Sequence, residues 1–229
     1  MIEAIYISHS VGCSGWDMEK ILEGTLFKAG CRMSRFRLGK DDNIKMLDWD
    51  FRKRDWNKHL EIVRTHPNLE VVMAPDYFRD TDIKDLIDKV ELLKECCKRV
   101  VIPIHAFNDK LLGYELAYPN IFSFNPTKKR YWIWDFKDAV THVLGGSPLR
   151  QFKMSAYFPN LKSVDGNWIF NNAIRFGKYY LPNGKEVGPK NRIYPDGKTY
   201  TTKEIFEFSV KNIDAFWKYQ HRLGKEAKK

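Results

Sequence analysis

Four short apolar runs end in side chains that could do nucleophilic or acid–base chemistry. The first run is followed by Asp48 and Asp50, and the others end at Asp76, His105 and Asp165. In a barrel of parallel strands all C-terminal strand ends open onto one face, so these side chains would share one pocket. Carboxyl groups gathered there could attack a substrate or carry a proton. Taken singly, each aspartate could equally cap the helix that follows its strand.

Other kinds of site find less support in the sequence. His105 could be a buried packing histidine, and His142 lies inside an apolar run, where packing is the expected role. We expect no metal, since no His, Cys, Asp or Glu set has the spacing of metal ligands. The chain has no G-x-S-x-G, G-x-G-x-x-G or Walker motif. Its four cysteines form no CxxC pair and are expected to be reduced thiols.

Alternating strand and helix patterns must position these candidates. Strand patterns cover residues 4–8, 31–38, 44–47, 69–73, 100–104, 121–124, 140–144 and the run that ends at Asp165. Helical patterns cover 17–29, the segments after Asp55 and Ser147, and the apolar positions from Ile83 to Leu93. Eight strands alternating with helices predict an α/β protein, a compact (β/α)8 TIM-like catalytic barrel over residues 1–178. The alternative is an open doubly wound sheet.

The last two strand patterns each lead into a glycine-containing turn. Residues 140–144 are followed by Gly145-Gly146, where the backbone can take positive φ or approach a ligand closely. Ser147 and Pro148 then start a helix. The second unit ends Asp165-Gly166-Asn167. These two units are the part of the chain around which the predicted site is organised.

After residue 178 the character of the chain changes. Two turn signals, 181–185 and 194–198, predict a small β-ribbon over the start of residues 179–229. It is basic and interleaved with tyrosines, namely Lys178, Lys185, Lys190, Arg192 and Lys198 with Tyr179, Tyr180 and Tyr194. Thr201 and Glu204 fit a capping box for a terminal helix. We expect the ribbon and this helix to pack on the barrel within one domain.

Composition indicates an anionic partner. Lys and Arg outnumber Asp and Glu by 39 to 29, giving a net charge of +10, which favours a nucleic acid. Hydrophobic residues make up 43% of the chain, which excludes a disordered protein. No apolar run approaches the roughly 20 residues of a membrane span, so we expect a soluble cytoplasmic protein. The sequence leaves the oligomeric state open.

The order of these strand-end features resembles the tRNA-guanine transglycosylase superfamily. The similarity covers roughly residues 40–178 and is greatest to its shorter DNA-acting members, phage and genomic-island enzymes that place 7-deazaguanines into DNA. Four motifs carry it: Leu47-Asp48-Trp49-Asp50, Met73-Ala74-Pro75-Asp76, Leu144-Gly145-Gly146-Ser147-Pro148 and Ser163-Val164-Asp165. Departures are His105 in the place of a glutamine, Phe124-Asn125-Pro126 in the place of a Gly-Gly turn, and the absence of the Cys/His zinc motif.

The resemblance implies a function and a role for each residue. It implies a transglycosylase that replaces guanine in DNA by a 7-deazaguanine such as preQ0, with Asp165 as nucleophile and no cofactor or zinc. Asp48 or Asp50 would be the acid/base, with Asp48 slightly preferred. Asp76, His105, Gly145 and Gly146 would bind the base. Contacts to the polynucleotide are expected from Trp49, Tyr77, Asn167, Trp168, Arg175, Lys178, Lys185, Lys190 and Arg192.

Three alternatives remain at this point. A substrate tRNA would place the chain with the tRNA-modifying enzymes of the same superfamily. A DNA glycosylase or nuclease could use the same acids for hydrolysis. A non-catalytic nucleic-acid-binding protein would instead depend on the basic ribbon.

Overall fold

Eight parallel strands close into a barrel in the computed structural model, which describes residues 2–8, 16–37, 39, 41, 43–119, 131–190 and 193–226, the last six without side chains. The strands are β1 (Ala4–Ser8), β2 (Phe27–Arg32), β3 (Met46–Asp48), β4 (Val71–Met73), β5 (Arg99–Pro103), β6 (Glu115–Pro119), β7 (Val140–Leu144) and β8 (Leu161–Asp165). Each strand pairs with the next in chain order, and β8 pairs with β1. The predicted TIM-like barrel is confirmed, and the open sheet is excluded.

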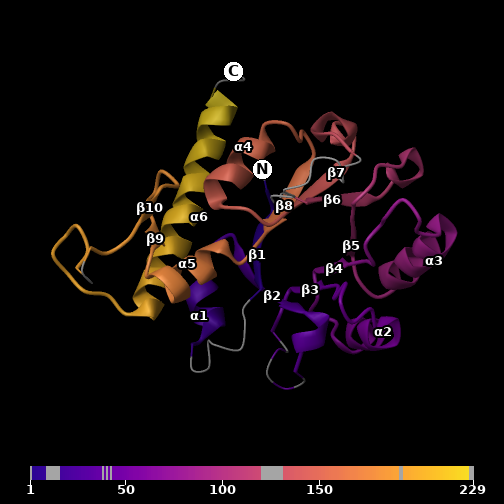
Figure 1. The fold of residues 1–229 in the computed structure, drawn as a ribbon, viewed down its shortest axis with the longest axis horizontal. Coiled ribbons are helices and arrows are strands. Elements are labelled where there is room, and N and C mark those ends of the chain that lie inside the picture. Colours follow the sequence, from indigo (N-terminus) through magenta and orange to yellow (C-terminus); the bar gives the residue numbers. More distant parts are fainter. Residues whose placement is uncertain are drawn as a thin grey trace.

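Helices cover the barrel unevenly. The α-helices are α1 (Met18–Leu22), α2 (Trp56–Thr65), α3 (Ile83–Lys94), α4 (Pro148–Ser155), α5 (Trp168–Phe176) and α6 (Thr202–Glu226). The short 3-10 turns η2 (Met33–Arg35), η3 (Asp109–Leu111) and η5 (Ile133–Phe136) lie in connections between strands. Figure 1 shows α2 and α3 on one side of the barrel and α4, α5 and α6 on another. Among the described residues, no helix has the length and apolar character needed to cross a membrane.

Alternating strand residues build two layers of core. Successive side chains of a strand point to opposite faces, so one set fills the barrel and the other meets the helices. Tyr6 and Met46 belong to the smaller buried cluster, together with residues of β4, β5 and β6. Ile5 and Leu47, their neighbours in sequence, belong to the larger cluster that includes the helices. The strand ends are thereby fixed on a packed frame.

The second strand lies earlier than the sequence pattern predicted. The predicted helix over 17–29 ends at Leu22, where Gly24 takes a positive φ of 69°, and residues 27–32 form β2 in place of the predicted 31–38. The prediction was wrong because β2 carries a cation near each end. Lys28 forms an ion pair with Glu70, whereas Arg32 reaches Asp48 at the other end of the barrel. These charges made the apolar pattern of β2 weak, although its backbone pairs with β1 on one side and β3 on the other.

The sixth strand is also displaced from its predicted position. Residues 121–124 lie outside the described part of the chain, and residues 115–119 form β6 between β5 and β7. Glu115 at its start made the segment look polar. Its carboxylate pairs with Arg99 at the start of β5, so the charge is accommodated at the N-terminal end of the barrel.

The C-terminal segment forms the predicted ribbon and helix. β9 (Tyr179–Tyr180) and β10 (Glu186–Val187) pair antiparallel, and the capping box at Thr201 and Glu204 starts α6. Figure 1 shows α6 beside α5 and the ribbon, and the three elements are in contact. Tyr180 and Tyr194 are buried, 1% and 5% exposed. The ribbon therefore turns these two tyrosines inward and does not offer them to a ligand.

Candidate active site

Three carboxyl groups gather at the C-terminal end of the barrel. Asp48 and Asp165 are the last residues of β3 and β8, and Asp76 follows β4. The parallel arrangement puts these strand ends on one face. The charges of Asp165 and Asp76 both act on the carboxyl group of Asp48, which places each of them within electrostatic reach of Asp48. The predicted convergence of these acids is therefore present in the fold.

Asp48 holds its proton unusually tightly. The pKa of Asp48 is raised from an ordinary 3.8 to about 7. Burial is the largest cause of this shift, and the negative charge of Asp165 is the second. Arg32 opposes the shift, with its Nε lying 3.6 Å from Oδ2 of Asp48. A carboxyl group with a pKa near neutrality can give and take a proton at physiological pH.

Asp50 has a different environment from Asp48. Its side chain accepts a hydrogen bond from the backbone N–H of Arg52 at 3.0 Å and another from Ser34. Burial alone would raise the pKa of Asp50, but these hydrogen bonds outweigh it and lower the pKa. Asp50 therefore stabilises the turn after β3 as an ionised group. Of the two predicted acid/base residues, the geometry favours Asp48.

Asp165 is held by the glycine turn that follows β7. The N–H of Gly145 donates to Oδ1 of Asp165 at 2.8 Å, and the amide of Gln151 donates to its backbone oxygen. Gly145 and Gly146 take positive φ values of 70° and 90°. A Cβ at Gly166, whose φ is 147°, would lie 3.3 Å from the Cα of Gly145. The structure shows this turn close to the carboxylate of Asp165, whereas its contact with the base stays a prediction.

Asp76 is oriented by His105. Nε2 of His105 lies 2.9 Å from Oδ1 of Asp76, and the imidazole stacks on Phe78 with 4.4 Å between ring centroids and 9° between planes. The Asp76 side chain is 13% exposed. One carboxylate oxygen of Asp76 is thus engaged by the histidine.

The predicted polynucleotide contacts divide by exposure. Trp49 and Tyr77 are 6% and 5% exposed, and both pack in the core, so neither offers a free surface to DNA. This corrects the expectation for both residues. Exposed positions are Trp168, Arg175, Lys185 and Lys190, whereas Asn167 and Lys178 are partly buried and Arg192 lies outside the described residues.

Glu186 gathers two of these candidates at the ribbon. The indole N–H of Trp168 donates to Glu186 at 3.2 Å, and Lys178 forms an ion pair with the same carboxylate at 3.5 Å. This contact ties the start of α5 to β10. Since α5 begins three residues after Asp165, the ribbon is attached to the end of the barrel where the acids lie.

Two residues of the site were missed in the sequence. Arg32 was assigned to the interior of a strand predicted too late in the chain, although a cation at the end of a strand next to an acidic strand end would have been the signal. Gln151 lies in the first turn of α4, after the Gly-Gly-Ser-Pro sequence, and its amide also donates to the oxygen of Gly145 at 3.1 Å. Its polarity on the buried side of an amphipathic helix was the available clue.

Within the described ranges, no group of three or more His, Cys, Asp or Glu side chains is arranged to hold a metal ion. A search among curated proteins finds no match. A family model described as a family of unknown function matches residues 24–218, which include all three acids. The chain therefore belongs to the family of unknown function DUF6610.

Proposed function

We propose that this protein is a base-exchange transglycosylase that replaces guanine in a polynucleotide by a 7-deazaguanine. The observation that carries the proposal is the coupled set of Asp48, Asp76 and Asp165 at the C-terminal end of a closed parallel barrel. Within it, one carboxyl group has a pKa of about 7 and another is held by a backbone N–H. This pairing suits a reaction that needs a proton carrier beside a nucleophile.

The proposed reaction consists of two displacements at C1′ of the nucleotide. An oxygen of Asp165 attacks C1′ as the bond to N9 of guanine breaks, and Asp48 gives its proton to the departing base. The incoming 7-deazaguanine then loses its N9 proton to Asp48, and N9 attacks C1′ while the bond to Asp165 breaks. Each displacement inverts the carbon, so the product retains the original configuration, as in retaining glycosidases. Asp48 ends the cycle protonated, as it began.

Asp76 is the proposed selector of the base. Its carboxylate can accept hydrogen bonds from N1–H and the 2-amino group, two donors that guanine and 7-deazaguanines share. His105 engages Oδ1 of Asp76 and thereby fixes the direction of the other oxygen. Adenine lacks both donors, so a site built on this contact rejects it.

The charge of the chain supports a nucleic acid as the substrate. The net charge of +10 favours a phosphate backbone, and Lys185 and Lys190 are exposed on the ribbon. The nucleotide must leave the base stack before C1′ can be reached. Trp168, 45% exposed beside the end of β8, is positioned to stack with a neighbouring base.

The test is incorporation of a labelled base. Purified protein is incubated with guanine-containing DNA, or with tRNA in a parallel reaction, and with labelled guanine or preQ0, and the label in the polymer is counted. Incorporation into DNA is expected for the wild type and for Asp50→Asn. It should be lost in Asp165→Asn and greatly reduced in Asp48→Asn. Label entering DNA equally well with Asp165→Asn would exclude the proposed nucleophile.

The same reactions separate the competing functions. Release of free guanine without incorporation identifies a hydrolytic glycosylase, and strand cleavage that requires a divalent ion identifies a nuclease. Binding of DNA without either reaction, insensitive to Asp165→Asn, identifies a non-catalytic binding protein. Each of these outcomes contradicts base exchange.

A further inference from the structure

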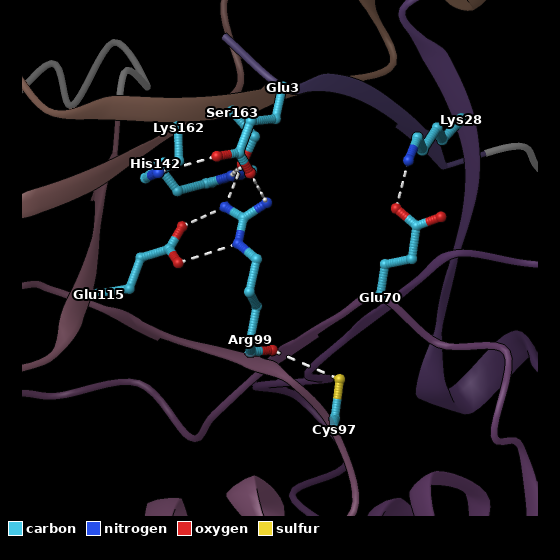
Figure 2. Close-up of polar contacts among 9 residues, drawn as sticks. All are labelled: Glu3, Lys28, Glu70, Cys97, Arg99, Glu115, His142, Lys162 and Ser163. Atoms are coloured by element: carbon cyan, nitrogen blue, oxygen red, sulfur yellow. Dashed lines mark hydrogen bonds and ion pairs between the residues drawn. The ribbon is translucent and has the colours of Figure 1, made fainter.

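A chain of hydrogen-bonded polar side chains, partly buried at Arg99 and fully buried at His142, runs along the inside of the barrel toward Asp165. Arg99 at the start of β5 donates to Glu115 with Nε at 3.1 Å and with Nη2, and Figure 2 shows its guanidinium between Glu115 and Ser163. Nη2 of Arg99 also donates to Oγ of Ser163 at 2.9 Å. Oγ of Ser163 lies 2.8 Å from Nδ1 of His142 on the neighbouring strand. Ser163 and His142 are both fully buried.

The donors in this chain determine where His142 carries its proton. A guanidinium only donates, so the Ser163 hydroxyl accepts from Arg99 and has its own proton left to place. Among the described residues, Nδ1 of His142 is the acceptor within reach of that hydroxyl. Nδ1 must then be unprotonated, and the neutral ring carries its hydrogen on Nε2.

Nε2 of His142 faces the second oxygen of Asp165. The distance from Nε2 to Oδ2 is 3.8 Å, beyond hydrogen-bond length, and Nε2 is a buried nitrogen with no hydrogen-bond partner in the described structure. Ser163 and Asp165 are two residues apart on β8 and therefore point to the same side of the strand. Oδ1 of Asp165 is already bound by the N–H of Gly145. The carboxylate of Asp165 thus accepts one hydrogen bond, from Gly145, and has Nε2 of His142 nearby as a second donor.

We propose that His142 is a positioning residue for Asp165. Arg99 and Ser163 keep the imidazole hydrogen on Nε2, from where it closes on Oδ2 and fixes the plane of the carboxylate when the substrate occupies the site. A buried Nε2–H without an acceptor carries a desolvation cost, which this closure removes. The tautomer follows from the hydrogen-bond geometry alone, whereas the effect on catalysis rests on the proposed base exchange.

Nuclear magnetic resonance tests the tautomer without any enzymatic assay. The wild-type protein, labelled with ¹³C and ¹⁵N, is recorded in two-bond ¹H–¹⁵N spectra, and the His142 ring signals are assigned through their correlations to the His142 backbone. The expected result is a pyrrole-type Nε2 and a pyridine-type Nδ1 in the wild type. In Ser163→Ala the preference should weaken to a mixture of both tautomers. A wild-type ring with its hydrogen on Nδ1 overturns the proposal, even if no variant folds.

Kinetics then test the positioning role. Glutamine places its amide near the position of Nε2 and asparagine near that of Nδ1, so His142→Gln should keep more activity than His142→Asn. We expect Ser163→Ala and His142→Asn to lower kcat by about 10²-fold with little change in KM, the scale of a misplaced reacting group. Thr141→Ala removes another buried hydroxyl and serves as the control, since among the described residues this hydroxyl donates to the backbone oxygen of Ala139 at 3.1 Å and takes no part in the chain from Arg99 to His142.

The outcomes separate this proposal from the proposed function. A wild type that exchanges no base, yet shows the Nε2–H tautomer, contradicts base exchange and supports the hydrogen-bond chain. Base exchange that continues at full kcat in Ser163→Ala and His142→Asn contradicts the positioning role. Equal loss in Thr141→Ala also contradicts it, since that variant leaves the chain from Arg99 to His142 intact.

Discussion

Replacing Asp48 by asparagine should stabilise the folded protein at alkaline pH. Burial and the neighbouring negative charges of Asp165 and Asp76 disfavour the ionised carboxylate, as the raised pKa of about 7 records. Asparagine has nearly the same shape and stays neutral at every pH. It therefore removes a cost that the wild type bears only when Asp48 is ionised.

The magnitude follows from the two pKa values of Asp48. In the unfolded chain the carboxyl has its ordinary pKa of 3.8, whereas in the folded protein the pKa is about 7. Between these values the folded state holds more protons, so this group lowers the free energy of unfolding as pH rises, by up to about 1.4 kcal/mol per pH unit. Above pH 7 the full cost is about 4 kcal/mol, and below pH 4 it vanishes.

Urea unfolding measured from pH 4 to pH 9 tests this expectation. The difference in free energy of unfolding between Asp48→Asn and the wild type should be near zero at pH 4, grow through pH 5 and 6, and level off above pH 7 at up to about 4 kcal/mol. Groups common to both proteins cancel in the difference. The gain in stability should accompany the loss of base exchange, as at other strained functional sites.

Asp50→Asn is the matched control, two residues away and with the same chemical change. Its carboxylate has a lowered pKa because Ser34 and the N–H of Arg52 bind the ionised form more strongly than burial disfavours it. This variant should therefore lose about 1–3 kcal/mol at pH 7, the opposite sign. A stability difference for Asp48→Asn that does not change with pH, or equal destabilisation of both variants, would refute the electrostatic account of Asp48.

Two further predictions concern the turn and the ribbon. Gly166→Ala should lower base exchange by about 10²-fold, because its Cβ would lie 3.3 Å from the Cα of Gly145. The control is Gly24→Ala, at a positive φ with open space around it, which should lower stability and leave kcat unchanged. Label incorporation measures the activity of both variants, and urea midpoints measure their stability. Double charge reversal at Lys185 and Lys190 should weaken DNA binding and lower the slope of log affinity against log salt by about 0.9 per lost phosphate contact, measured by fluorescence anisotropy at several salt concentrations. An unchanged slope would remove the ribbon from the DNA-binding surface.

The acids could be found in the sequence because each one lies at the end of a short buried strand or within three residues after it. Apolar β3, β4 and β8 are easily recognised, and a closed barrel brings their ends together whatever the loops do. The sequence could not decide between Asp48 and Asp50, since residues two apart on an extended strand point to the same side. It depended on where β3 ends and on a turn that binds Asp50 through Ser34, a contact set by tertiary structure.

Two strands and the role of His142 could not be predicted, because polar or charged side chains stand at positions where a local pattern leads one to expect apolar ones. β2 and β6 carry charged residues whose partners lie on other strands, and a local pattern of apolar residues does not reveal such partners. A packing role was expected for His142 because a strand pattern gives no sign of a polar partner on the neighbouring strand. Ser163 of β8 is that partner, and Arg99 of β5 donates to Ser163.

The pairing of β1 with β8 and the contact between α6 and the start of β2 have a consequence for folding during synthesis on the ribosome. The N–H of Leu26, just before β2, donates to Asp214 at 2.8 Å, and β1 completes its pairing only with β8. The strands made first therefore wait for segments made last. Until β8 has left the exit tunnel, β1 keeps an open edge that can pair with another chain. Nascent chains of this protein should accordingly need protection by chaperones until synthesis is nearly finished.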